Sequence, residues 1–122
     1  MMKTILLVDD SATMLMSLRQ TLDMAGFKTE TASDGAIAFG KLQGGLKPDL
    51  IITDINMPNM GGIEFIKKAR TVLRFTPILA LTTESQQTKR DEAKQNGATG
   101  WLVKPVGGPD LVKVIKQVVP GA

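Results

Sequence analysis

Three aspartates and one lysine, each placed directly after a short apolar run, are the residues best able to carry chemistry in this sequence. Asp9 and Asp10 follow the first run, Asp54 closes a later one, and Lys104 closes the last. Carboxylates held close together either raise a pKa or bind a cation, and oxygen ligands favour Mg²⁺, Ca²⁺ or Mn²⁺. A carboxylate can also attack phosphorus to give an aspartyl phosphate. These residue types therefore indicate metal-assisted phosphoryl transfer, with Asp54 as the nucleophile.

The composition excludes several other kinds of site. The chain of 122 residues contains no Cys and no His. This removes disulfides, thiolate nucleophiles, Ser-His-Asp triads, His-ligated metals and phosphohistidine carriers. No apolar run approaches the roughly 20 residues of a membrane span, and the run at 5–8 is too short for the core of a signal peptide. We therefore expect a cytoplasmic protein without a membrane partner.

The net charge of +3 comes from 15 basic and 12 acidic residues, a mild excess. The basic residues gather loosely between Lys67 and Lys94. A nucleic-acid-binding protein is expected to carry a denser patch and a recognisable docking element. We interpret these charges as solvated helix faces and predict no nucleic-acid partner.

Short apolar runs alternate with amphipathic segments along the whole chain. Strands are predicted at 4–8, 27–32, 50–53, 78–81 and 101–103. Helices are predicted around 15–22, from Ser33 or Asp34 through Leu42, after Gly62, over the polar stretch 84–96, and around 111–118. The alternation specifies one α/β domain over 1–122, with a parallel sheet of five strands and five helices. The flavodoxin-like order 2-1-3-4-5 suits this length.

This topology explains how the reactive residues meet. Ligands of an open parallel sheet bind outside the carboxyl ends of the strands, at the switch point between the first and third strands. The two aspartates of the first strand should therefore lie beside Asp54, with the Thr82 hydroxyl and the Lys104 ammonium close by. Flavin mononucleotide would use the same place, but an Asp-Asp pair repels a bare phosphate. A phosphate is expected there only together with a metal.

Each of these residues also has a purely structural interpretation. Asp9, Asp10 or Ser11 would cap the first helix equally well. Thr82 can cap the next helix, and the lysine can be an ordinary surface side chain. Trp101, taken alone, is expected in the core. The functional interpretation rests on the presence of all these residues at four strand ends together.

The sequence resembles the receiver domain family of two-component signalling, and within it the stand-alone chemotaxis regulators of the CheY type. Four motifs carry the resemblance, in order and over essentially the whole chain: ILLVDDS, DLIITDINMPNMGG, LALTTES and GWLVKP. It implies a monomeric phosphoacceptor that catalyses its own phosphorylation and dephosphorylation, with Mg²⁺ and without an organic cofactor. It also implies a CheA-like histidine kinase as phosphodonor and a downstream target such as a flagellar motor component.

The resemblance implies a role for each matching position. Asp54 would accept the phosphoryl group. Asp10, Asp54 and the backbone carbonyl of Asn56 would bind Mg²⁺ directly, and Asp9 would act through water. Lys104 would bridge to Asp54 and then to the phosphoryl group.

Other matching positions would carry the signal. The Thr82 hydroxyl would turn toward the phosphoryl oxygen, supported by the N–H of Thr83. Trp101 would be the aromatic partner of this switch, where Tyr or Phe is more usual, and Lys104-Pro105 would be a cis peptide bond. The signalling face would comprise the fourth helix, the fifth strand and the fifth helix.

Departures from the family pattern and alternative functions complete the expectations. Gly61 replaces an acidic or similar polar residue and should loosen the loop after Asp54, whereas Asn56 and Glu84 match the chemotaxis type. Val106 replaces the more usual Phe. A phosphorelay intermediate or phosphate sink is an alternative, as is an interaction module that is never phosphorylated. A phosphatase is disfavoured because Asn56 occupies the place of its second aspartate.

Overall fold

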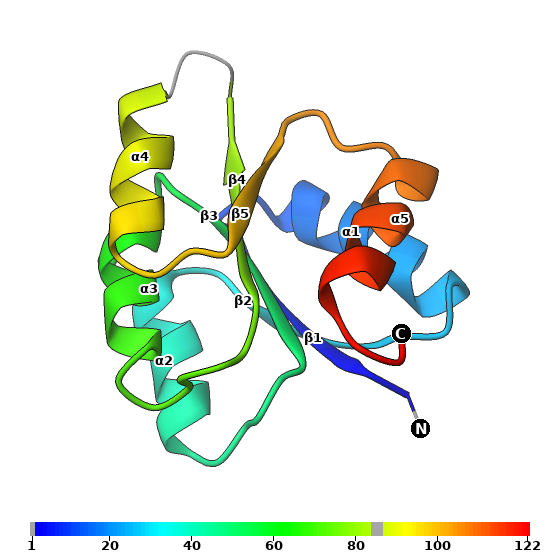
Figure 1. Ribbon diagram of the computed structural model, residues 1–122, viewed down its shortest axis with the longest axis horizontal. Helices are drawn as coiled ribbons and strands as arrows, with labels where there is room; N and C mark the ends of the chain where they lie inside the picture. Colours follow the sequence, from blue (N-terminus) through cyan, green and yellow to red (C-terminus); the bar gives the residue numbers. More distant parts are fainter. Residues whose placement is uncertain (1, 84–86) are drawn as a thin grey trace.

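The computed structural model describes residues 2–83 and 87–122, which form a parallel five-stranded sheet between two layers of helices (Figure 1). The strand order is β2-β1-β3-β4-β5, which confirms the predicted flavodoxin-like α/β fold. The strands are β1 (Thr4–Val8), β2 (Lys28–Ala32), β3 (Leu50–Asp54), β4 (Ile78–Thr82) and β5 (Gly100–Val103). The helices are α1 (Ala12–Met24), α2 (Gly35–Gln43), α3 (Gly62–Ala69), α4 (Gln87–Gln95) and α5 (Gly108–Val118).

The three central strands are apolar because both of their faces are covered. Helices α2, α3 and α4 lie on one side of the sheet, and α1 and α5 on the other (Figure 1). Successive side chains of a strand point to opposite faces, so Leu6 and Ile51 pack in the core beneath α2 and α3, whereas Leu7 and Ile52 pack in the core beneath α1 and α5. The prediction that the first, third and fourth strands are buried on both faces is confirmed.

The strand bounds differ from the predicted ones in a consistent way. Asp54 pairs with Leu81 and Thr82 pairs with Val103, so the polar residues that were expected to close β3 and β4 belong to the ladder itself. The sheet therefore continues to the residues that carry the chemistry. Phe27 precedes β2 and is buried in the α1–α5 core.

Side-chain caps begin the first two helices. The Ser11 hydroxyl accepts a hydrogen bond from the Met14 N–H at 3.2 Å, and Asp34 Oδ1 accepts one from the Ile37 N–H at 2.8 Å. Of the alternative caps for α1, Ser11 is the one observed, which leaves the two aspartates before it to other contacts.

The polar helix predicted over 84–96 is found as α4, and residues 84–86 lie outside the described residues. Within Gln87–Gln95, Ala93 is the single buried residue. In the described part of the chain, no helix combines the length and the apolar character that crossing a membrane requires.

Candidate functional site

Asp9, Asp10 and Asp54 come together at the carboxyl ends of β1 and β3. The two strands are neighbours, and Val8 pairs with Thr53, so the residues that follow them lie side by side. Each aspartate offers a carboxylate oxygen, and these oxygens lie within 4.8 Å of one another. Asp9 and Asp54 are buried, and Asp10 is exposed. The cluster therefore consists of two carboxylates inside the protein and one at the surface.

Asp9 is the most constrained of the three carboxylates. Its Oδ1 accepts a hydrogen bond from the Ser11 N–H at 2.9 Å. Its Oδ2 is buried and has no hydrogen-bond partner among the described residues. Burial raises the pKa of Asp9, and the nearby charges of Asp54 and Asp10 raise it further, whereas the Ser11 N–H and the Lys104 ammonium oppose the rise. An unsatisfied buried oxygen beside two other carboxylates fits a hard cation such as Mg²⁺, which prefers oxygen ligands.

Lys104 links the far edge of the sheet to this cluster. Its Nζ lies 3.2 Å from Asp54 Oδ1 and 3.6 Å from Asp9 Oδ2, and its side chain is 24% exposed. The Lys104 N–H donates to the Thr82 carbonyl at 2.7 Å, which continues the β4–β5 ladder past β5. The peptide bond from Lys104 to Pro105 is cis. The ammonium partly offsets the repulsion among the three carboxylates.

The loop after Asp54 folds back against the end of β3. Asp54 Oδ1 accepts the Ile55 N–H at 2.8 Å, and the Ile55 carbonyl accepts the Gly62 N–H at 2.8 Å. A Cβ at Gly62 would meet the Asp54 carbonyl oxygen far inside van der Waals contact, so only glycine permits this approach. Asn56, the predicted carbonyl ligand, is exposed at the start of the loop. Gly61 has an extended backbone and precedes α3 without a side-chain cap.

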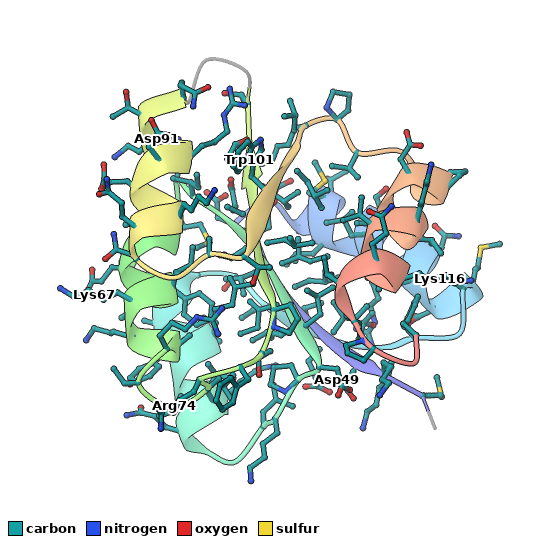
Figure 2. The ribbon with its side chains drawn as sticks, viewed as in Figure 1. Asp49, Lys67, Arg74, Asp91, Trp101 and Lys116 are labelled. Carbon is teal, nitrogen blue, oxygen red and sulfur yellow. The ribbon has the colours of Figure 1, made fainter. Side chains whose placement is uncertain are left out.

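Thr82 and Trp101, predicted as switch residues, occupy very different environments. Thr82 is fully buried, and its hydroxyl donates to the Leu102 carbonyl at 3.4 Å. Trp101, which is labelled in Figure 2, is 41% exposed. The Arg90 guanidinium lies 5.6 Å from its ring centre. The expectation that Trp101 lies in the core is wrong, because the tryptophan sits on an edge strand whose outer face meets the polar helix α4. Thr83 is exposed directly after β4.

A contact that the sequence analysis missed lies one strand away. The Asn59 side-chain amide donates to Asp34 Oδ2 at 2.9 Å, between the loop after β3 and the start of α2. Asp34 was predicted only as a helix cap, and Asn59 was not singled out. The one available signal was the residue type, because Asn tolerates the positive φ of 67° that it adopts here.

A surface cavity of about 430 Å³ lies away from this cluster. It is lined by residues that include Asp49, Arg74 and Phe75. Figure 2 shows Asp49 and Arg74 at the opposite end of the molecule from Trp101. None of the predicted site residues lines this cavity, so the carboxylate cluster remains the candidate site.

Comparison with known proteins gives the family. The model of the response regulator receiver domain matches residues 5–116. Chemotaxis protein CheY1 of Helicobacter pylori is 36% identical over 120 residues, covering 96% of each chain. Chemotaxis protein CheY-3 of Vibrio cholerae is 36% identical over 117 residues, covering 93% of this chain and 89% of its own. The solved structure of Vibrio cholerae chemotaxis protein CheY4 superposes with a TM-score of 0.91 at 45% identity, covering 98% of this chain and 100% of its own. The chain therefore belongs to the response regulator receiver domain family and is of the CheY type.

Proposed function

We propose that the chain acts as a single receiver domain in the cytoplasm, a monomer whose Asp54 accepts a phosphoryl group from a histidine kinase. The observation that carries this proposal is the convergence of three carboxylates and the Lys104 ammonium around Asp54. Relatives named as chemotaxis proteins favour a CheA-like kinase as the donor and a motor component as the target. A phosphorelay intermediate or phosphate sink would use the same chemistry with a different partner.

The transfer needs little covalent chemistry from the protein. An Asp54 carboxylate oxygen forms a bond to phosphorus while the bond from phosphorus to the donor histidine nitrogen breaks. Asp10, Asp54, the Asn56 carbonyl and, through water, Asp9 would hold Mg²⁺. When bound, Mg²⁺ supplies positive charge that offsets the charge on the phosphoryl oxygens. The Lys104 ammonium, already 3.2 Å from Asp54, contributes the same compensation from the other side.

Thr82 would sense the new phosphoryl group. Its hydroxyl donates to the Leu102 carbonyl over 3.4 Å, which is long for a hydroxyl donor and therefore weak. Turning this hydroxyl to a phosphoryl oxygen, with the Thr83 N–H in support, exchanges a weak bond for a charge-assisted one. The exchange removes a contact between β4 and β5.

The signal would reach a partner at the face formed by α4, β5 and α5. Helix α4 buries only Ala93 within Gln87–Gln95, so little apolar packing holds it in one position. Trp101 of β5 is exposed, and Arg90 of α4 lies over its ring. Phosphorylation would shift an existing equilibrium at this face and change the affinity for the target.

An acid-quenched intact-mass spectrum after incubation with phosphoramidate tests the proposal. We expect a single phosphoryl adduct in Mg²⁺, none in EDTA, and none in Asp54→Asn. Because phosphoramidate replaces the kinase, the result does not depend on identifying a partner. Absence of an adduct at early times, with Mg²⁺ binding demonstrated separately, would favour an interaction module that is never phosphorylated.

A further inference from the structure

The loop that follows Asp54 is tied at its tip to a different part of the sheet. The tie consists of Asp34 and Gly35, which begin α2, and Asn59 and Met60 of the loop; we call these four residues the Asp34 clamp. Asn59 Nδ2 donates to Asp34 Oδ2 at 2.9 Å, and the Gly35 N–H donates to the Met60 carbonyl at 3.0 Å. These two bonds join segments that lie 25 residues apart in the chain.

The clamp leaves little room for adjustment. A Cβ at Gly35 would lie 2.7 Å from the Met60 carbonyl oxygen and 2.9 Å from the Phe65 Cβ, so the loop and α3 pack directly on the glycine backbone. Asp34 is buried and uses both carboxylate oxygens, one for the Ile37 N–H and one for Asn59. The Asn59 amide and the Ile37 N–H hold the pKa of Asp34 below its usual value, as expected for a carboxylate that accepts several hydrogen bonds.

The same loop is tied a second time at its base, and the two ties bracket the predicted metal ligand. At the base, the Gly62 N–H donates to the Ile55 carbonyl at 2.8 Å. At the tip, the clamp holds Asn59 with its φ of 67°. Asn56 lies between the two ties and is itself exposed. Its position depends on the bonds at either side.

We infer that Asp34 is a positioning residue for the phosphorylation site, which sets the place of the Asn56 carbonyl by holding Asn59. The inference rests on the proposed function, because it gives Asp34 a part in binding Mg²⁺ without contact to the ion. It goes beyond that function by placing a determinant of metal affinity after β2, a strand that contributes none of the proposed ligands. Residues that hold a metal ligand in place without touching the ion orient that ligand and tune metal affinity.

Two substitutions remove the bond from its two sides and leave the helix cap intact. Asp34→Ser keeps an oxygen for the Ile37 N–H, because Ser caps helices as well as Asp does, but it is too short to hold Asn59 as well. Asn59→Gly removes the amide and keeps the positive φ at no steric cost. Asp23→Ser is the matched control, because it also removes a carboxylate that accepts a side-chain hydrogen bond. The donor is the Thr29 hydroxyl, at 3.0 Å, near the other end of β2.

Mg²⁺ titration by calorimetry gives the first measurement. Asp34→Ser and Asn59→Gly should each weaken Mg²⁺ binding by about threefold to fivefold, since one net hydrogen bond is worth about that factor. Asp23→Ser should leave the affinity within about twofold. In the Asn59→Gly background, Asp34→Ser should have no further effect, because the bond is already absent. A loss of the same size in both backgrounds would show that the Asp34 charge acts at long range, and would overturn the inference.

Amide hydrogen exchange in EDTA gives a second measurement that needs neither metal nor phosphate. Exchange at residues 56–61 should be faster in Asp34→Ser than in the wild-type protein, and exchange in α2 should be unchanged. If the wild-type protein neither binds Mg²⁺ nor forms a phosphoryl adduct, the proposed function fails, and exchange alone decides whether the clamp orders the loop. Unchanged exchange at 56–61, or unchanged Mg²⁺ affinity in a protein that binds Mg²⁺, would refute the role of Asp34.

Discussion

Replacing Lys104 by methionine tests the charge balance of the carboxylate cluster. The Lys104 ammonium lies 3.2 Å from Asp54 Oδ1 and 3.6 Å from Asp9 Oδ2. With an effective dielectric constant of about 20, each contact is worth about 5 kcal/mol before desolvation is subtracted. In the wild-type protein, desolvation offsets most of this energy. Removing only the lysine, however, leaves two buried carboxylates without their cation, which is the costly way to break such a pair.

We expect Lys104→Met to lower the free energy of unfolding by about 3 kcal/mol in EDTA. This is the low end of the range for a broken buried pair, chosen because the lysine side chain is 24% exposed and partly screened by water. In a domain of 122 residues it corresponds to a fall of roughly 10 °C in Tm. Excess Mg²⁺ should narrow the difference, because a cation in the cluster replaces the missing charge and binds the variant more tightly.

Differential scanning calorimetry in EDTA and in Mg²⁺ checks this prediction. Lys113→Met, which removes an exposed lysine from α5, is the control for loss of surface charge and should change Tm by little in either solution. A Lys104→Met protein that is as stable as the wild-type protein in EDTA would refute the reasoning. So would a stability difference of the same size with and without Mg²⁺.

Three further predictions concern other parts of the site. Gly62→Ala should cost roughly 3 kcal/mol in urea unfolding, because its Cβ would collide with the Asp54 carbonyl oxygen; Gly40→Ala, whose Cβ would meet nothing within 4 Å, should not destabilise the protein. Trp101 is the only tryptophan and is 41% exposed, so its emission should move to shorter wavelength if beryllofluoride and Mg²⁺ turn the ring inward; an unchanged spectrum in a protein that forms the adduct would remove it from the switch. Hydrogen bonds lower the pKa of Asp34 in the folded state, so its contribution to stability is complete above the unfolded-state pKa of about 3.9 and is lost as pH falls through the lower folded-state pKa. The difference in unfolding free energy between the wild-type protein and Asp34→Ser should therefore shrink in acid. A constant difference from about pH 6 to about pH 3 would contradict this assignment.

The fold could be predicted because its determinants are local in the sequence. The aliphatic runs of β1, β3 and β4 mark strands that are buried on both faces, and the topology rules for parallel sheets then place Asp9 beside Asp54. The order of the strands, and the meeting of the carboxylates at their ends, followed from these two inputs. For the helix caps the sequence left alternatives open, Asp9, Asp10 or Ser11 for α1 and Ser33 or Asp34 for α2, and the structure shows Ser11 and Asp34 in these places.

The features that the sequence did not predict depend mainly on contacts between segments that are distant in the chain. Trp101 is exposed on the edge strand β5, and this place at the edge of the sheet is not visible in the residue type, which favours burial. The bond from Asn59 to Asp34 requires a positive φ in one loop and a spare carboxylate oxygen in another. No periodicity in the sequence encodes such a pair. Phe27 was assigned to β2 because it is apolar, although it packs in the core just before the strand.

The sparse burial of α4 has a consequence for how this protein can change over time. Substitutions at exposed polar positions usually alter stability by no more than about 0.5 kcal/mol, and within Gln87–Gln95 only Ala93 is buried. The carboxylate cluster, in contrast, lies at the ends of β1 and β3, in which every residue except Thr4 is buried. Under the proposed function, specificity for a new partner would be acquired by substitutions on the exposed face of α4 that leave the carboxylate cluster unchanged. Partner choice and chemistry would then be encoded in separate residues and could evolve independently.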